Sequence, residues 1–228
     1  MTSFDPDAAY MDRLTTIMDR LKEEYGVPDR PDRDDPVDSL ITTILSQNTN
    51  DTNRDRAKQQ LDETYGSYQE ILDADTDELA DVIRIAGLGP TKAERIQTAL
   101  SRIKEEKGEF TLDHVNAMGK EEAKAYLQDF PGVGPKTAAV TLCFVFGMPV
   151  MPVDTHVYRL AQRLDLIPQD VGRSKAHELL ESVVPDDRIY EFHINLIKHG
   201  RAVCTAQNPS CQDSILARYC INCPCQEE

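Results

Sequence analysis

Two side chains of this sequence have the types and spacing to do covalent chemistry: a lysine and an aspartate that follows it by 18 residues. Lys136 lies in Phe130–Ala138, which reads Phe-Pro-Gly-Val-Gly-Pro-Lys-Thr-Ala, and Asp154 lies in Val153–His156, which reads Val-Asp-Thr-His. In the first turn of a helix a lysine opposes the helix dipole, so its free amine, a nucleophile that can form a Schiff base, is easier to reach. An aspartate before a helix is typically its N-cap, and a carboxylate held there is well oriented to face an amine or a developing cation. The residue types therefore make Lys136 and Asp154 candidates for a catalytic pair, with a surface lysine and a plain helix N-cap as the alternatives.

The turn before Lys136 is suited to contact a phosphate. Gly132 and Gly134 flank Val133, and neither glycine carries a Cβ, so the backbone can approach a ligand closely. Pro135 fits the first turn of a helix, where its missing N–H costs nothing. Because the unpaired amides of such a turn attract anions, we predict that Gly132, Val133 and Gly134 contact a DNA backbone. The alternative is a tight turn between two packed helices.

The same kind of turn occurs twice. Ala86–Ala93, which reads Ala-Gly-Leu-Gly-Pro-Thr-Lys-Ala, parallels Pro131–Ala138 at a distance of 45 residues, and both are typical of helix–hairpin–helix turns. In the first copy Thr91 takes the position of Lys136, and Lys92 follows about 100° further round the helix. The turn alone therefore indicates backbone contact and not catalysis.

The formal net charge of −15 at first argues against a nucleic-acid partner. The acidic residues are spread along the chain, 24 of the 40 are Asp, and Arg outnumbers Lys by 15 to 10. This pattern suggests the hypothesis of a protein adapted to high salt, where phosphate attraction is screened and a DNA-binding protein relies on amides, shape and inserted side chains. An acidic enzyme with a small substrate is the alternative.

Helical periodicity predicts the elements that position these motifs. Met11, Leu14, Ile17, Met18 and Leu21 form one face of a helix that ends near Gly26. No segment alternates like a strand, so we predict an all-α protein of about ten helices. Ser174 and Asp187 are the expected N-caps of two of them. The later helices are expected over residues 37–45, 51–64, 76–84, 91–106, 119–128, 136–146, 154–164, 174–183 and 187–199.

Two further features bear on location and metal binding. No apolar run approaches the roughly 20 residues that span a membrane, and the N-terminal residues lack a signal region, so we expect a soluble, cytoplasmic protein. Cys143 stands in an apolar stretch and is expected in the core. The other five of the six cysteines fall within the last 25 residues, which in an intracellular protein favours a metal site over disulfides.

Phe130–Ala138, Val153–His156, His199-Gly200-Arg201 and the Cys204-x6-Cys211 spacing together resemble the endonuclease III family of helix–hairpin–helix DNA glycosylases with an iron–sulfur cluster. The resemblance extends from about residue 10 to 223. It implies two all-α lobes with a DNA-binding cleft between them. One lobe would cover residues 36–148, and the other would combine residues 1–35 with 149–228 and carry the cluster.

The resemblance also implies roles for the catalytic pair. The enzyme would bind duplex DNA, flip out a damaged base and cleave the glycosidic bond. Lys136 would attack C1′ and carry the sugar as a Schiff base, after which β-elimination nicks the strand. Asp154 would stabilise the cationic sugar and help to deprotonate the attacking amine. His156 is interpreted as a packed or hydrogen-bonded histidine.

Two DNA contacts follow from the resemblance alone. Leu88 matches the position of an apolar wedge that enters the base stack, with a core leucine as the alternative. The turn Ser46–Asp51 resembles the loop whose amide side chain fills the space left by the flipped base. Asn48 aligns with that amide, although a slip of one residue would place Gln47 there.

The cysteines depart from the family spacing of Cys-x6-Cys-x2-Cys-x5-Cys, which holds a [4Fe-4S] cluster. Cys204, Cys211 and Cys220 match three of the four positions, but the third position is Ser214, whose oxygen is a poor substitute for a thiolate. We predict that Cys223 is the fourth ligand, with Cys225 as the less favoured choice. A zinc site and a degraded cluster remain the alternatives.

The function expected from the resemblance is a bifunctional glycosylase and AP lyase acting on oxidised pyrimidines. A relative that only removes mismatched or alkylated bases is the first alternative, since base removal alone can use water activated by Asp154. A non-catalytic DNA-binding or redox-responsive protein is the second. We expect the protein to be a monomer that binds duplex DNA and no membrane.

Overall fold

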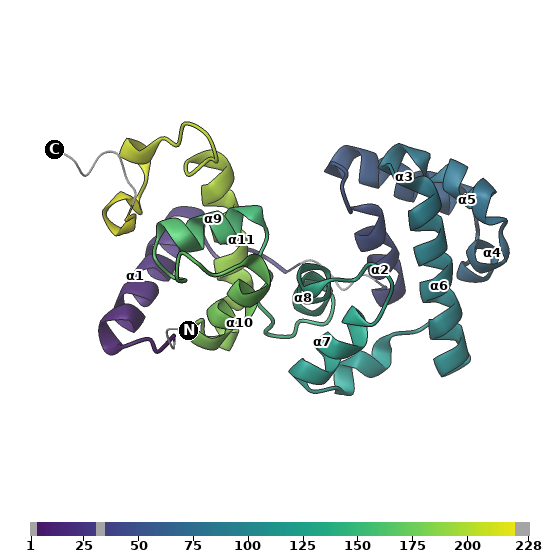
Figure 1. Ribbon diagram of the computed structural model, residues 1–228, viewed down its shortest axis with the longest axis horizontal. Coiled ribbons are helices and arrows are strands. Elements are labelled where there is room, and N and C mark those ends of the chain that lie inside the picture. The colour runs from purple at the N-terminus through teal and green to yellow at the C-terminus, as the bar shows by residue number, and fades with distance from the viewer. Residues whose placement is uncertain (1–3, 31–34, 222–228) are drawn as a thin grey trace. The chain divides into compact units, whose positions relative to one another are not determined.

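The computed structural model describes residues 4–30 and 35–221. The chain divides into two compact units, one continuous (Asp32–Phe146) and one made of two segments (Met1–Pro31 and Gly147–Glu228). All regular secondary structure in the described residues is helical, which confirms the predicted all-α fold (Figure 1).

The continuous unit is built around the long helix α6 (Gly89–Lys107), on which α2 (Pro36–Leu45), α4 (Tyr68–Asp73) and α5 (Thr76–Val82) pack (Figure 1). Its apolar residues, among them Ile96, Leu100 and Ile103, are completely buried. A Cβ on Gly89 would lie 2.7 Å from the carbonyl oxygen of Ala80, so only glycine allows α5 and α6 to pack this closely. The other elements of this unit are α3 (Asp51–Thr64), η1 (Arg84–Ala86), η2 (Asp113–Ala117), α7 (Lys120–Gln128) and α8 (Pro135–Phe144).

The second unit is built around α11 (Ile189–Ala202), which contacts both α1 (Ala8–Tyr25) and α9 (Thr155–Arg163). The apolar face of α1 is buried as predicted, apart from Met11, which is half-buried. The hydroxyl of Tyr10 on α1 donates to the carbonyl of Leu166 at 2.9 Å, so the first helix packs with the last third of the chain. The remaining elements are α10 (Arg173–Val183), η3 (Asp186–Arg188), η4 (Cys211–Asp213) and η5 (Ala217–Tyr219).

Both predicted N-caps in this unit are wrong. Helix α10 begins at Arg173, because Gly172 takes the extended cap conformation, so Ser174 lies inside the helix. Asp187 lies in the 3₁₀ turn η3, which the bond from the Arg188 amide to the Pro185 carbonyl closes at 2.9 Å, so α11 starts two residues later.

Candidate active site and cysteine pocket

The glycine turn at residues 132–134 contains two glycines with different structural needs. Gly132 has φ +79°, and a Cβ there would lie 2.8–2.9 Å from the side chain of Arg95, so the fold itself requires glycine. Gly134 has φ −88°, and no atom lies within 4 Å of the place its Cβ would take. Between them Val133 is buried, and its amide donates to the Phe130 carbonyl at 3.0 Å. The open space at Gly134 suits a ligand that approaches the backbone closely.

Lys136 is the second residue of α8, after Pro135, and its side chain is exposed. It makes no hydrogen bond or ion pair with any other described residue. An exposed amine without a carboxylate partner is accessible to a sugar carbon, as the predicted nucleophile must be.

Leu88 and Asn48 are both exposed and both left-handed. Leu88 has φ +55° and 54% of its surface exposed, which overturns the alternative of a core leucine. Asn48 has φ +53° at the exposed tip of the loop between α2 and α3. A leucine in this conformation costs about 1–2 kcal/mol relative to the right-handed form. Backbone strain of this kind is common at functional sites. The turn therefore exposes Leu88 although its conformation lowers the stability of the folded protein.

Lys92 shows why the two hairpins differ. It is completely buried, and its Nζ donates to the carbonyls of Leu45 at 2.7 Å and Ala86 at 2.8 Å. Burial, aided by the nearby Arg95, lowers the pKa of the Lys92 amine. The shift of one residue relative to Lys136 thus changes an exposed amine into an internal structural one, a difference that the rotation of 100° per residue anticipates.

Asp154 is the N-cap of α9, and its Oδ1 accepts a hydrogen bond from the Val157 amide at 2.8 Å. Its other oxygen has no hydrogen-bond partner among the described residues, and the side chain is half-buried. The segment before it is held by two histidines that the sequence analysis did not single out. His177 and His193 each place Nδ1 at 2.9 Å from a carbonyl, that of Met151 and that of Pro152 respectively. Nothing in the sequence marks these contacts, because both partners are remote backbone atoms.

His156 is packed and hydrogen-bonded, as interpreted from the sequence. Its Nδ1 accepts from Arg159 at 3.1 Å, and its ring lies 3.1 Å from the place where Gly200 would carry a Cβ. Arg159 also donates to the Gly200 and Cys204 carbonyls, each at 2.9 Å. This arginine therefore holds the start of the cysteine segment in place.

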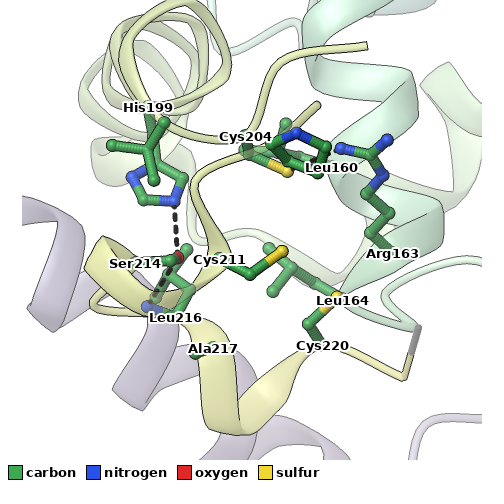
Figure 2. A pocket seen from close by; sticks show the side chains of 12 residues that line it. Leu160, Arg163, Leu164, His199, Cys204, Cys211, Ser214, Leu216, Ala217 and Cys220 are labelled. Atoms are coloured by element: carbon green, nitrogen blue, oxygen red, sulfur yellow. Dashed lines mark hydrogen bonds between the residues drawn. The ribbon is translucent and has the colours of Figure 1, made fainter. Parts of the chain in front are cut away.

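Cys204, Cys211 and Cys220 line one small pocket of about 20 Å³, which α9 and α11 border (Figure 2). Arg163 donates to Cys204 Sγ at 3.0 Å. No group of three His, Cys, Asp or Glu side chains in the described part of the chain is placed to hold a metal ion. Cys223 and Cys225 lie outside the described residues.

Ser214 lines the same pocket but is engaged elsewhere. Its hydroxyl lies 3.0 Å from His199 Nε2 and accepts from the Leu216 amide at 3.2 Å, and Figure 2 shows it directed toward the histidine. The other nitrogen of His199 is 2.9 Å from the Tyr25 hydroxyl. Burial lowers the pKa of His199 to about 4, so the ring is neutral near pH 7. The Ser214 hydroxyl and both ring nitrogens of His199 thus already have hydrogen-bond partners within the protein.

The model of the HhH-GPD superfamily of base excision DNA repair proteins matches residues 41–186. Endonuclease III of Thermotoga maritima is 35% identical over 82% of this chain and 83% of its own length. The chain belongs to the endonuclease III family. The prediction of a base excision DNA repair enzyme of this family is thereby confirmed.

Other members of the family extend the comparison. A candidate DNA glycosylase of Arabidopsis thaliana is 34% identical over 74% of this chain, a match that spans 57% of that protein's length. The solved structure of a trapped endonuclease III–DNA covalent intermediate is 25% identical, with a TM-score of 0.79, and covers 96% of this chain and 99% of that one. Every helix among residues 4–30 and 35–221 is too short or too polar to span a lipid bilayer.

Proposed function

We propose that this endonuclease III family member is a bifunctional DNA glycosylase and AP lyase that removes oxidised pyrimidines from duplex DNA. The observation that carries the proposal is the exposed, unpartnered amine of Lys136 at the helix–hairpin–helix turn. A solved relative was trapped as a covalent intermediate with DNA, which supports a covalent mechanism for this chain.

Lys136 supplies the nucleophile, and Asp154 supplies a negative charge that balances the positive charge formed on the sugar. As the bond between C1′ and the base breaks, the base leaves with the electron pair and takes up a proton. The amine of Lys136 then bonds to C1′ and gives up one proton. When the sugar ring opens, the C1′–O4′ bond breaks, O4′ takes up a proton, and the nitrogen and C1′ form a protonated imine. Loss of a proton from C2′ and cleavage of the C3′–O3′ bond release the phosphate strand. The unbonded oxygen of Asp154 stabilises the positive sugar and accepts a proton from the amine.

The continuous unit supplies the DNA contacts of the proposed site. The amides of Gly132 and Gly134 bind a phosphate, since a helix start favours an anion, whereas the Val133 amide already donates to the Phe130 carbonyl. Leu88 enters the base stack as a wedge, and Asn48 fills the space of the flipped base. We further propose that the two compact units are the two lobes of the enzyme, each supplying one member of the catalytic pair.

We propose that the cysteine pocket is the site of a [4Fe-4S] cluster, as the family implies. Cys204, Cys211 and Cys220 bring three sulfur atoms to one pocket, and the guanidinium of Arg163 donates to the Cys204 sulfur. Ser214 is committed to His199 and the Leu216 amide, so we propose Cys223 as the fourth ligand. When bound, the cluster supplies a rigid covalent link that fixes the C-terminal segment.

Strand cleavage on defined duplexes tests the proposed activity. Duplexes that carry thymine glycol, a mismatched thymine or an alkylated base are incubated with the protein and analysed with and without alkali. We expect cleavage of the thymine glycol strand without alkali, abolished in Lys136→Ala and strongly slowed in Asp154→Asn. Cleavage that appears only after alkali would instead show a monofunctional glycosylase, and no base release from any duplex would favour a non-catalytic protein.

A further inference from the structure

Gln47 connects two parts of the continuous unit that lie 85 residues apart in sequence. Its Nε2 donates to the Gly132 carbonyl at 2.9 Å, and its Oε1 accepts from Arg95 Nη1 at 2.7 Å. A carbonyl can only accept and a guanidinium can only donate, so the two partners fix the orientation of the amide. Both the Nε2 and the Oε1 atoms of Gln47 therefore form hydrogen bonds within the protein.

Arg95 packs directly against the turn that Gln47 binds. Its Cδ, Nε and Nη1 lie 2.8–2.9 Å from the place where Gly132 would carry a Cβ, so the side chain fills the space that glycine leaves. Arg95 has no carboxylate within 4.0 Å among the described residues, although Arg54, Arg102 and Arg188 each have one or more. Its neutral partner leaves the positive charge of Arg95 uncompensated beside the turn.

The two contacts join the loop between α2 and α3 to the helix–hairpin–helix turn. Asn48 follows Gln47 directly and is exposed in a left-handed conformation. The contacts that hold Gln47 therefore also restrict the backbone position of Asn48. Lys92 holds the start of the same loop through the Leu45 carbonyl. Helix α6 carries both cations and thus secures this loop at two points.

We propose that Gln47 and Arg95 act as a positioning bridge, which sets the Asn48 loop against the Gly132 turn so that both engage one damaged duplex. This inference rests on the proposed function, because the roles of Asn48 and the turn come from it. The bridge acts through its neighbours and need not touch DNA.

The first test uses the protein without DNA. Hydrogen exchange is compared for the parent, Gln47→Ala and Arg95→Met, with Gln69→Ala as a control for loss of an exposed glutamine that bonds only Asp73. We expect faster exchange in both residues 46–50 and residues 130–134 in the two bridge variants, and no change in the control. Faster exchange in only one of the two segments would overturn the bridge, whatever the protein does to DNA.

The second test measures affinity for a duplex with a tetrahydrofuran abasic-site analogue and for the intact duplex at several salt concentrations. We expect Gln47→Ala and Arg95→Met each to lower the preference for the abasic duplex about tenfold, or about 1.4 kcal/mol. The double variant should lose little more than either single one, since both remove the same bridge. Arg56→Met, which removes an equal charge at an exposed site on α3, should keep the preference.

Two results of the second test would contradict the proposal. Additive losses in the double variant would show two independent contacts. If Arg95→Met weakened both duplexes equally and reduced the salt slope by about 1 while Gln47→Ala had no effect, Arg95 would be a plain phosphate contact. A parent protein with no preference for the abasic duplex would refute the proposed function instead, and the exchange result would still decide the bridge.

Discussion

Replacing Gly134 with alanine should weaken DNA binding without harming the fold. The backbone there has φ −88° and ψ 179°, which any residue adopts, and an added Cβ meets no atom within 4 Å. Alanine restricts the unfolded chain more than glycine does, so Gly134→Ala should stabilise the protein by about 0.4–1 kcal/mol. If a phosphate accepts from the amides of this turn, the new methyl group stands in its path. Loss of one hydrogen bond to a charged group costs about 1.5–3 kcal/mol, or roughly 10- to 100-fold in affinity.

Gly132→Ala provides the opposite case. Its φ of +79° costs alanine about 1–2 kcal/mol, and the new Cβ also displaces Arg95. This variant should therefore be less stable than the parent, whereas Gly134→Ala should not be.

Thermal denaturation and fluorescence anisotropy with an intact duplex separate the two effects. Gly119→Ala is the matched control, because Gly119 also precedes a helix in extended conformation with open space around its Cβ. We expect Gly119→Ala and Gly134→Ala to have similar stability and only the latter to lose affinity. Equal affinity of these two variants would refute the phosphate-binding turn and favour a simple interhelical turn.

Three further predictions follow from the geometry of single residues. Leu88→Asn should keep or raise the stability of the protein, since Asn tolerates the left-handed conformation. The same substitution should slow base removal from duplex DNA, and an unchanged excision rate would argue against a wedge. Lys92→Met should destabilise the protein by about 2–4 kcal/mol in urea unfolding, because two buried carbonyls lose their donor. Since the folded pKa of Lys92 is lowered, the unfolded chain binds more protons, so the stability gap between parent and variant should widen as pH rises toward 10.5; a gap that narrows would contradict that assignment. Iron and sulfide analysis of anaerobically purified protein should give full occupancy in Ser214→Ala and a loss in Cys223→Ala, and the reverse pattern would exclude Cys223 as the fourth ligand.

The sequence alone predicts most of the helices, because a helix that is long enough to bury one face shows a periodic pattern of apolar residues. Helix α4 has only six residues, too few for a repeat, and was missed. Its N-cap, Ser67, bonds the Glu70 amide at 3.2 Å and is the signal that could have revealed it.

The candidate site was predictable where function depends on local motifs. The glycine turn and the N-cap at Asp154 each depend on a few consecutive residues, so the residue types alone indicate them. The contacts of Gln47 with Gly132 and of His193 with Pro152 join residues that the sequence separates widely, and each involves a backbone carbonyl that any residue type could offer. No pattern of residue types can therefore predict them.

Covalent trapping tests the central claim most directly. The protein is incubated with a duplex that carries an abasic site in the presence of sodium borohydride, which reduces an imine to a stable amine, and the adduct is mapped by peptide mass spectrometry. We predict one adduct on Lys136, absent in Lys136→Gln and retained in Lys92→Met. An adduct on another amine, or none in the parent protein, would contradict the account.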